Sequence, residues 1–162
     1  NLLTRCIELE IIPACQEKGM GILAYMPLMQ GILAQLWDNI DDIPESRRRT
    51  RHFSCERSMV RHGEPGCEVE LWAVYREIGR ICDGAGLPMA DVALAWTLAN
   101  PAITSVIIGG RRPKQVLRNI KAMDLRLDDS LITELNAATE TIKQTLGTNN
   151  DMFCGGTESR TR

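Results

Sequence analysis

A basic excess, long hydrophobic runs and a secretion signal are all missing from this sequence of 162 residues. Lys and Arg number 19 against 21 Asp and Glu, so with a net charge of −2 no overall basic field attracts nucleic acid. No apolar run approaches the roughly 18 residues that a membrane span requires. The first residues also lack the hydrophobic core and cleavage site of a signal peptide. We therefore expect a cytoplasmic protein without nucleic-acid or membrane partners.

The sequence also lacks the motifs of metal sites, disulfide frameworks and common hydrolases. Its six cysteines form no C-x-x-C pair and match no zinc or disulfide spacing, which favours free thiols and argues against a redox sensor. The only histidines, His52 and His62, have no carboxylate or cysteine at helical ligand spacing, and no G-x-S-x-G is present. We expect neither a metal nor a Ser or Cys hydrolase. Three cysteines lie in helical patterns and three in polar segments open to oxidation: Cys6, Cys15 and Cys82, and Cys55, Cys67 and Cys154.

The hydrophobic content, 44% with 25% charged residues, is that of an ordinary globular protein, and the length fits one domain over residues 1–162. Apolar residues recur at three and four positions between Gly and Pro breakers, which predicts several helices. The expected helices span residues 7–18, 67–83, 89–99, 113–123 and 129–144, with a helical turn at 30–36. The helix at 89–99 is apolar on nearly all sides, so we expect it to be buried.

Two short apolar runs, at residues 21–25 and 104–108, predict strands buried on both faces of a parallel sheet, and the second is β-branched at four of its five positions. Strands alternating with helices indicate an α/β fold. Two strands alone are too few, because the strands of a parallel sheet must be covered on both faces and paired at both edges. We expect either another chain or further sequence of this protein to complete the sheet.

Residues 37–66 have no hydrophobic periodicity, which is unusual inside a domain and typical of a functional or mobile loop. This arginine-rich loop holds Arg47, Arg48, Arg49, Arg51, Arg57 and Arg61. Two interpretations are equally open. The arginines could clamp a phosphate through bidentate hydrogen bonds, or the segment could be a solvated polar loop.

The residues that follow each predicted strand are the candidate binding site. Gly109, Gly110 and Arg111 lie between a strand and a helix N-terminus, where free amides attract phosphate oxygens, although an ordinary turn would look the same. Gln115 and Asn119 are four residues apart on one helix face, where amides can bond an adenine edge. A separate candidate, Tyr25, ends the first strand and can stack on a flat ring, or it can be a tyrosine at the rim of the core.

Several motifs together resemble the C-terminal half of the aldo-keto reductases. They are Asn1-Leu2-Leu3, the segment from Ala24 to Gly31, Arg49 to Phe53, Ala90 to Trp96 and Ser105 to Arg111, with an ending from Leu146 to Phe153 like that of bacterial-type members. The resemblance implies a (β/α)₈ barrel that binds NADPH across the carboxyl ends of its strands and reduces carbonyl compounds by hydride transfer. A complete barrel needs about 200 residues or more, so this chain would hold roughly the seventh and eighth strands and their helices.

The resemblance also implies the cofactor-binding residues. Tyr25 would stack on the nicotinamide, and the loop of Met26, Pro27, Leu28, Gln30 and Gly31 would wrap the pyrophosphate. The adenosine and its 2′-phosphate would be held by Gly109, Gly110, Arg111, Gln115, Arg118 and Asn119. The sequence departs from the family in two respects: Met26 and Met29 replace a serine and a small residue, and Arg118 stands where many members have Glu or Gln.

The family's catalytic Asp, Tyr, Lys and His lie on the second to fourth strands, and no segment of this sequence matches them. We expect the chain to supply NADP(H)-binding residues to an NADPH-dependent reductase of aldehydes or ketones and to be inactive alone, because the alkoxide needs a positioned acid. The alternative is a non-catalytic half-barrel that binds a nucleotide or associates with itself or with the missing N-terminal half. Sequence upstream of Asn1 that carries the catalytic set would favour the enzyme.

Overall fold

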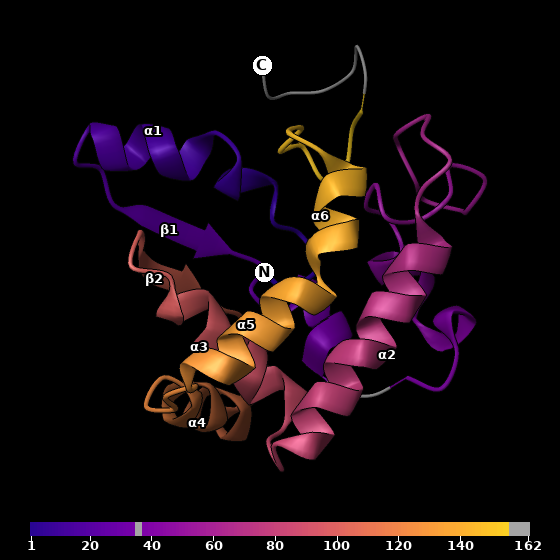
Figure 1. Cartoon of the computed structure of the whole chain (residues 1–162). Helices are drawn as coiled ribbons and strands as arrows, with labels where there is room; N and C mark the ends of the chain where they lie inside the picture. Colours follow the sequence, from indigo (N-terminus) through magenta and orange to yellow (C-terminus); the bar gives the residue numbers. More distant parts are fainter. Residues whose placement is uncertain (35–36, 156–162) are drawn as a thin grey trace.

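The computed structural model describes residues 1–34 and 37–155 and has the predicted α/β arrangement. Strands β1 (Ile22–Tyr25) and β2 (Ile103–Ile107) pair in parallel, with Ala24 opposite Val106 and Tyr25 opposite Ile107. The described residues also form the helices α1 to α6 (Figure 1). Among the described residues no helix is both long and apolar enough to cross a membrane.

Three of the predicted helices are confirmed to within one residue at each end. They are α2 (Glu68–Gly84), α3 (Met89–Ala99) and α4 (Pro113–Ala122). The α3 helix is buried as expected, since it packs against β2, α2 and α4. Its apolar side chains join those of α2, α5 and α6 in one core around Tyr75, Ile78, Val92, Leu135 and Ile142. The predicted helical turn is the 3₁₀ segment Met29–Ala34, and the last two residues of that prediction lie outside the described residues.

The helix predicted at residues 7–18 is shorter in the structure. A 3₁₀ turn (Cys6–Glu8) precedes α1 (Ile11–Glu17), and Pro13 is the third residue of that helix. Proline has no N–H to donate and clashes with the carbonyl four residues earlier, so it is tolerated only in the first turn. Pro13 therefore prevents the helix from beginning at residue 7.

The single helix predicted at residues 129–144 was also wrong. The structure has α5 (Asp129–Ala138) and α6 (Glu140–Leu146), separated at Thr139. The buried guanidinium of Arg5 donates to the carbonyl of Asn136 and to Oγ1 of Thr139, both at 2.9 Å. Because the distant Arg5 side chain is bonded to the Asn136 carbonyl, the helix changes direction at this point.

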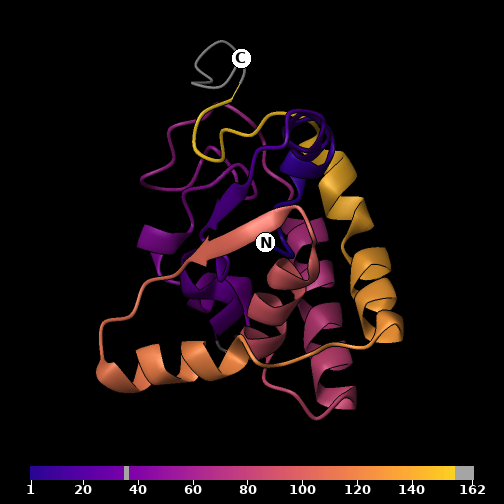
Figure 2. The ribbon, with the colours of Figure 1, turned by 90° about the vertical axis from the view of Figure 1, so that its left-hand side faces the viewer.

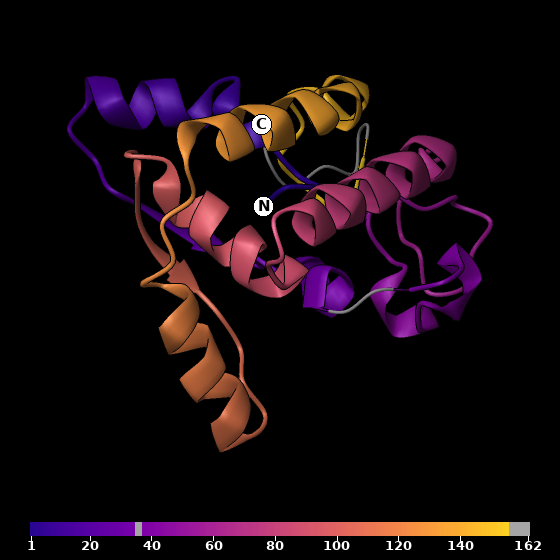
Figure 3. The ribbon, with the colours of Figure 1, turned by 60° about the horizontal axis from the view of Figure 1, so that its bottom comes forward.

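One face of the sheet is open, contrary to the prediction that both strands are buried on both faces. Leu23, Tyr25 and Ile107 are more than half exposed, while Ala24 and Val106 point to the covered side. Half-buried and exposed side chains alternate along β1, because the helices of the described residues cover a single face of this two-stranded sheet. Figure 2 and Figure 3 show that α4 projects away from the other helices, and Leu117 on it is 61% exposed.

The cysteines differ strongly in accessibility. Cys67 was placed in a polar segment open to oxidation, but it is 5% exposed at the start of α2, where its N–H donates to the carbonyl of His52. Burial raises the pKa of Cys67 to about 12 and that of Cys82 to about 11, since the thiolate loses its hydration. Cys55 is exposed.

We therefore expect iodoacetamide at neutral pH to alkylate Cys55 well before Cys67 and Cys82, because only the thiolate reacts. Peptide mass spectrometry over time measures the order. If Cys67 were labelled as fast as Cys55, the arginine-rich loop would not cover Cys67.

Candidate functional site

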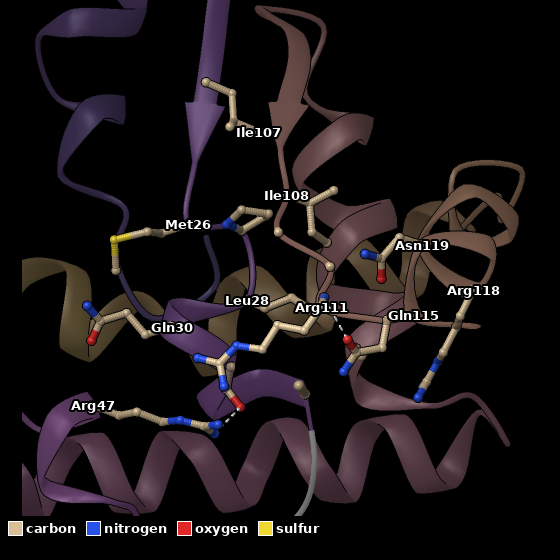
Figure 4. Close-up of a pocket in the computed structure, with 16 residues that line it drawn as sticks. Met26, Leu28, Gln30, Arg47, Ile107, Ile108, Arg111, Gln115, Arg118 and Asn119 are labelled. Atoms are coloured by element: carbon tan, nitrogen blue, oxygen red, sulfur yellow. Dashed lines mark hydrogen bonds between the residues drawn. The ribbon is translucent and has the colours of Figure 1, made fainter. Parts of the chain in front are cut away.

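The loops that follow the two strands form opposite sides of one groove. Parallel strands end at the same edge of a sheet, so the residues after Tyr25 and after Ile107 are brought together there. The groove has a volume of about 690 Å³, within the range of roughly 300–1,000 Å³ of small-molecule sites. Figure 4 shows Met26, Leu28 and Gln30 on one side, and Arg111, Gln115 and Asn119 on the other.

The predicted site residues, with the exception of Tyr25, line this groove. They are Met26, Pro27, Leu28, Gln30, Gly31, Gly109, Gly110, Arg111, Gln115, Arg118 and Asn119. Tyr25 lies on the open face of the sheet instead and is 55% exposed. The groove is also lined by Ala34, Ala90, Ile107 and Ile108, which the sequence did not single out, and by Arg47, which the sequence named only as one arginine of the arginine-rich loop. The arginine-rich composition was a signal for Arg47, whereas Ala90 reaches the groove only through the packing of α3.

The loop after β1 has an unusual backbone. Met26, Met29 and Gln30 have φ angles of 54°, 47° and 55°, and Gly31 has 89°. Left-handed conformations at non-glycine residues each cost of order 1–3 kcal/mol and cluster at functional sites. A Cβ on Gly31 would lie 3.3 Å from Nη1 of Arg47, so glycine also allows the arginine to approach. The turn folds back tightly beneath the groove.

The loop after β2 is fixed by its own helix. Oε1 of Gln115 accepts hydrogen bonds from the backbone N–H groups of Arg111 and Arg112, at 2.9 and 3.1 Å. A Cβ on Gly110 would come within 2.7 Å of Val116, so the loop can pack against α4 only with glycine there. Because its oxygen is already engaged, Gln115 has only its NH₂ group left to donate to a ligand.

Three arginines contribute positive charge to the groove. Arg111 is exposed and extends from the β2–α4 loop toward the opposite loop (Figure 4). Nη1 of Arg47 donates to the carbonyl of Gly31 at 3.4 Å, and its guanidinium lies 5.8 Å from the centre of the Trp37 ring. Arg118 forms an ion pair of 3.0 Å with Asp91. The groove therefore presents a cationic surface on both sides.

The structure corrects both interpretations of the arginine-rich loop. The loop includes the 3₁₀ turns Ile40–Asp42 and Glu45–Arg47, and Thr50, His52 and Phe53 within it are buried, so it is not simply solvated. Nor do its arginines face one phosphate together, because three of the six bind carboxylates of the protein. Arg48 and Arg57 bind Asp41, Arg57 also binds Glu68, and Arg51 binds Glu64. Of the six, Arg47 lines the groove.

His52 has a structural role at the base of this loop. Its Nε2 donates to the carbonyl of Leu3 at 2.7 Å, and Nδ1 lies 3.0 Å from the hydroxyl of Thr50. Burial, together with the nearby charge of Arg51, lowers the pKa of His52 to about 4. In the part of the chain that the structure describes, no three His, Cys, Asp or Glu side chains are grouped so that they could hold a metal ion.

Comparison with known proteins places the chain in a family. The model of the "Aldo/keto reductase family" matches residues 1–140. The "Uncharacterized oxidoreductase YrpG" of Bacillus subtilis is 32% identical over 84% of this chain and 37% of its own length. The "NADH-specific methylglyoxal reductase" of Escherichia coli is 25% identical over 89% of this chain and 41% of its own length.

A solved structure supports the fold. The thermostable aldo-keto reductase Tm1743, crystallised with the inhibitor epalrestat, superimposes with a TM-score of 0.50 at 19% identity, over 82% of this chain and 35% of that one. The chain thus spans between a third and a half of the length of these proteins. The α/β arrangement with two parallel strands agrees with part of such a structure. From the family match and these relatives, we conclude that the chain belongs to the aldo/keto reductase family.

Proposed function

We propose that this chain is the NADP(H)-holding part of a reductase that converts aldehydes or ketones to alcohols. The observation that carries the proposal is the groove at the carboxyl ends of β1 and β2, which brings Arg47 and Arg111 together with two glycine-containing loops. Extended anionic cofactors need positive charge at their phosphates and closely approaching backbone at their pyrophosphate.

The residues present fit this cofactor. Glycine at position 31 leaves room for the Arg47 guanidinium at the groove, and glycine at position 110 lets the β2–α4 loop pack against Val116, so neither loop carries a side chain at these positions. Oε1 of Gln30 is buried beside the groove with no hydrogen-bond partner among the described residues, so a ribose hydroxyl could donate to it. In this proposal Arg47 would meet the pyrophosphate, and Arg111 would meet the 2′-phosphate that distinguishes NADPH from NADH.

Within the complete protein these residues would bind and orient, while NADP(H) would supply the hydride. Carbonyl reduction also needs an acid that protonates the developing alkoxide. Tyr25 and Tyr75 are the only tyrosines. Tyr25 is on the open sheet face, and the hydroxyl of Tyr75 accepts from the N–H of Trp37 within the core. We therefore infer that the acid comes from residues outside this sequence and that the chain alone is inactive.

The same reasoning assigns the two strands a place in the barrel. We propose that β1 and β2 are its seventh and eighth strands, and that residues outside this sequence cover the open face. Leu23, Tyr25 and Ile107 would then face the interior of the closed barrel. There Tyr25 could still stack on the nicotinamide, although it does not line the groove formed by this chain.

The cofactor proposal is tested by titrating NADPH and NADH against the chain and its Arg111→Ala variant. We expect the variant to bind NADPH about tenfold more weakly, because it loses a charge-assisted hydrogen bond, and to bind NADH nearly as before. The matched control is Arg61→Ala, an exposed arginine away from the groove. Unchanged NADPH affinity in Arg111→Ala would remove Arg111 from the phosphate site, and no binding of either nucleotide to the wild type would refute the proposed function.

A further inference from the structure

Arg51 joins the arginine-rich loop to the C-terminal segment, residues 147–153. Its side chain is 9% exposed, and Nε donates to both carboxylate oxygens of Glu64 at 2.8 and 3.0 Å. Nη1 donates to the carbonyl of Asn149 at 2.9 Å, and Nη2 to the carbonyl of Leu146 at 3.2 Å. The backbone N–H of Arg51 donates to the carbonyl of Met152 at 2.8 Å. Arg51 thus binds three carbonyls, one at the end of α6 and two in the C-terminal segment.

The C-terminal segment is organised to present these carbonyls. Oδ1 of Asn149 accepts from the N–H of Asp151, and Oδ1 of the buried Asp151 accepts from the N–H groups of Phe153 and Cys154. Such local bonds hold a non-helical backbone in a fixed conformation. The C-terminal segment therefore holds its carbonyl groups in fixed positions, where they accept from the Arg51 side chain and backbone.

Arg51 lies close in sequence to Arg47, the arginine that lines the groove. Arg47 is only four residues before Arg51 and is weakly held by its own contacts, a 3.4 Å bond to Gly31 and a ring contact with Trp37. The position of Arg47 must therefore be set by the backbone of its loop. His52, bonded to Leu3, and Arg51 hold that backbone immediately downstream.

We propose that Arg51 is a positioning residue, through which the C-terminal segment holds Arg47 in place at the groove. The proposal rests on the proposed function, since the groove is taken to bind the pyrophosphate of NADP(H). According to this proposal, Arg51 and the C-terminal segment affect the affinity for the cofactor although they lie outside the groove. It also predicts which part of the cofactor is affected: the pyrophosphate near Arg47, and not the adenosine 2′-phosphate near Arg111.

The test uses Arg51→Lys, which keeps the charge toward Glu64 but cannot span both carbonyl acceptors. Arg61→Lys is the matched control, an exposed arginine of the same loop. Hydrogen exchange of residues 44–50 is measured without any nucleotide, and affinity is measured for NADPH and for 2′-AMP, which lacks the pyrophosphate. A second variant that deletes residues 149–162 removes two of the carbonyl acceptors without altering the loop.

We expect faster exchange at residues 44–50 in Arg51→Lys and in the deletion, about tenfold weaker NADPH binding and unchanged 2′-AMP binding. The effect on NADPH should vanish in an Arg47→Ala background, which a general loss of stability would not produce. Unchanged exchange would overturn the proposal whether or not the chain binds nucleotide. Equal weakening of NADPH and 2′-AMP would overturn it as well. Faster exchange in Arg51→Lys, together with a wild type that does not bind NADPH, would support the role of Arg51 in holding the loop and refute only the proposed function.

Discussion

Replacing Arg5 by methionine is expected to lower the free energy of unfolding by about 3–5 kcal/mol, the effect of removing one partner from a buried ion pair. Arg5 is 6% exposed, and its guanidinium donates to both carboxylate oxygens of Glu8 at 2.8 Å. It also donates to Asn136 and Thr139 at the α5–α6 junction and lies 5.6 Å from the centre of the Trp96 ring. The substitution leaves these acceptors unsatisfied inside the protein.

The pKa of Glu8 gives a second measure of the same contact. Burial by itself would raise this pKa, but the hydrogen bonds and charges of Arg5 and Lys143 hold it below its ordinary value. We expect it to rise in Arg5→Met, because Lys143 alone then offsets the burial. Titration of the carboxyl by NMR measures this change.

Urea unfolding followed by circular dichroism measures the stability, with Arg80→Met as control. Arg80 also pairs with two glutamates, Glu77 and Glu134, but at the surface, with its side chain 62% exposed. Exposed ion pairs contribute little, so the control should unfold at nearly the wild-type urea concentration. Equal midpoints for Arg5→Met and Arg80→Met would show that Arg5 does not stabilise the junction.

Lowering the pH from about 7 to about 5 should remove about 2 kcal/mol of stability through His52. Burial lowers the pKa of His52 to about 4 in the folded protein, whereas the ordinary value of 6.5 applies when the chain unfolds. Between these two values the unfolded state binds more protons, so acid favours unfolding. The contribution is complete above pH 6.5 and is lost as the pH falls toward 4.

The control is His52→Gln, whose amide can still donate to the carbonyl of Leu3 but does not titrate. Urea unfolding of both proteins at several pH values gives the difference between them. The wild type should lose more stability than His52→Gln between pH 7 and pH 5. Parallel pH dependences would show that His52 is hydrated in the folded protein. Carboxylates with lowered pKa, such as Glu68, act mainly at lower pH and are common to both proteins.

The sequence predicted the helices well wherever the reason for a helix is local. The helices α2 and α3 begin and end as expected, because apolar spacing and nearby glycine or proline residues define them. Pro13 is tolerated only in the first turn of a helix, and the structure shows that α1 starts accordingly at Ile11. The break between α5 and α6 at Thr139 could not be predicted from neighbouring residues, since it depends on Arg5, more than 130 residues away.

The groove-lining residues were predicted because the carboxyl ends of parallel strands share one edge, so motifs after two strands meet in space. The arginine-rich loop could not be interpreted in this way. Whether an arginine faces a ligand or a carboxylate depends on where the chain places Asp41, Glu64 and Glu68, and no periodicity encodes that. Arg47 could be separated from its neighbours only by its position in the fold.

The sequence by itself determined the order of helices and strands, the free cysteines expected from their spacing, the loops that form the groove, and the resemblance to a family that the comparisons then established. Each of these depends on residue type and short-range spacing. Only the tertiary structure decided that one sheet face is open, that Tyr25 lies on that face, and that Arg51 binds the C-terminal segment. These features depend on which residues meet across long separations, where burial and hydrogen bonding act and local spacing carries no information.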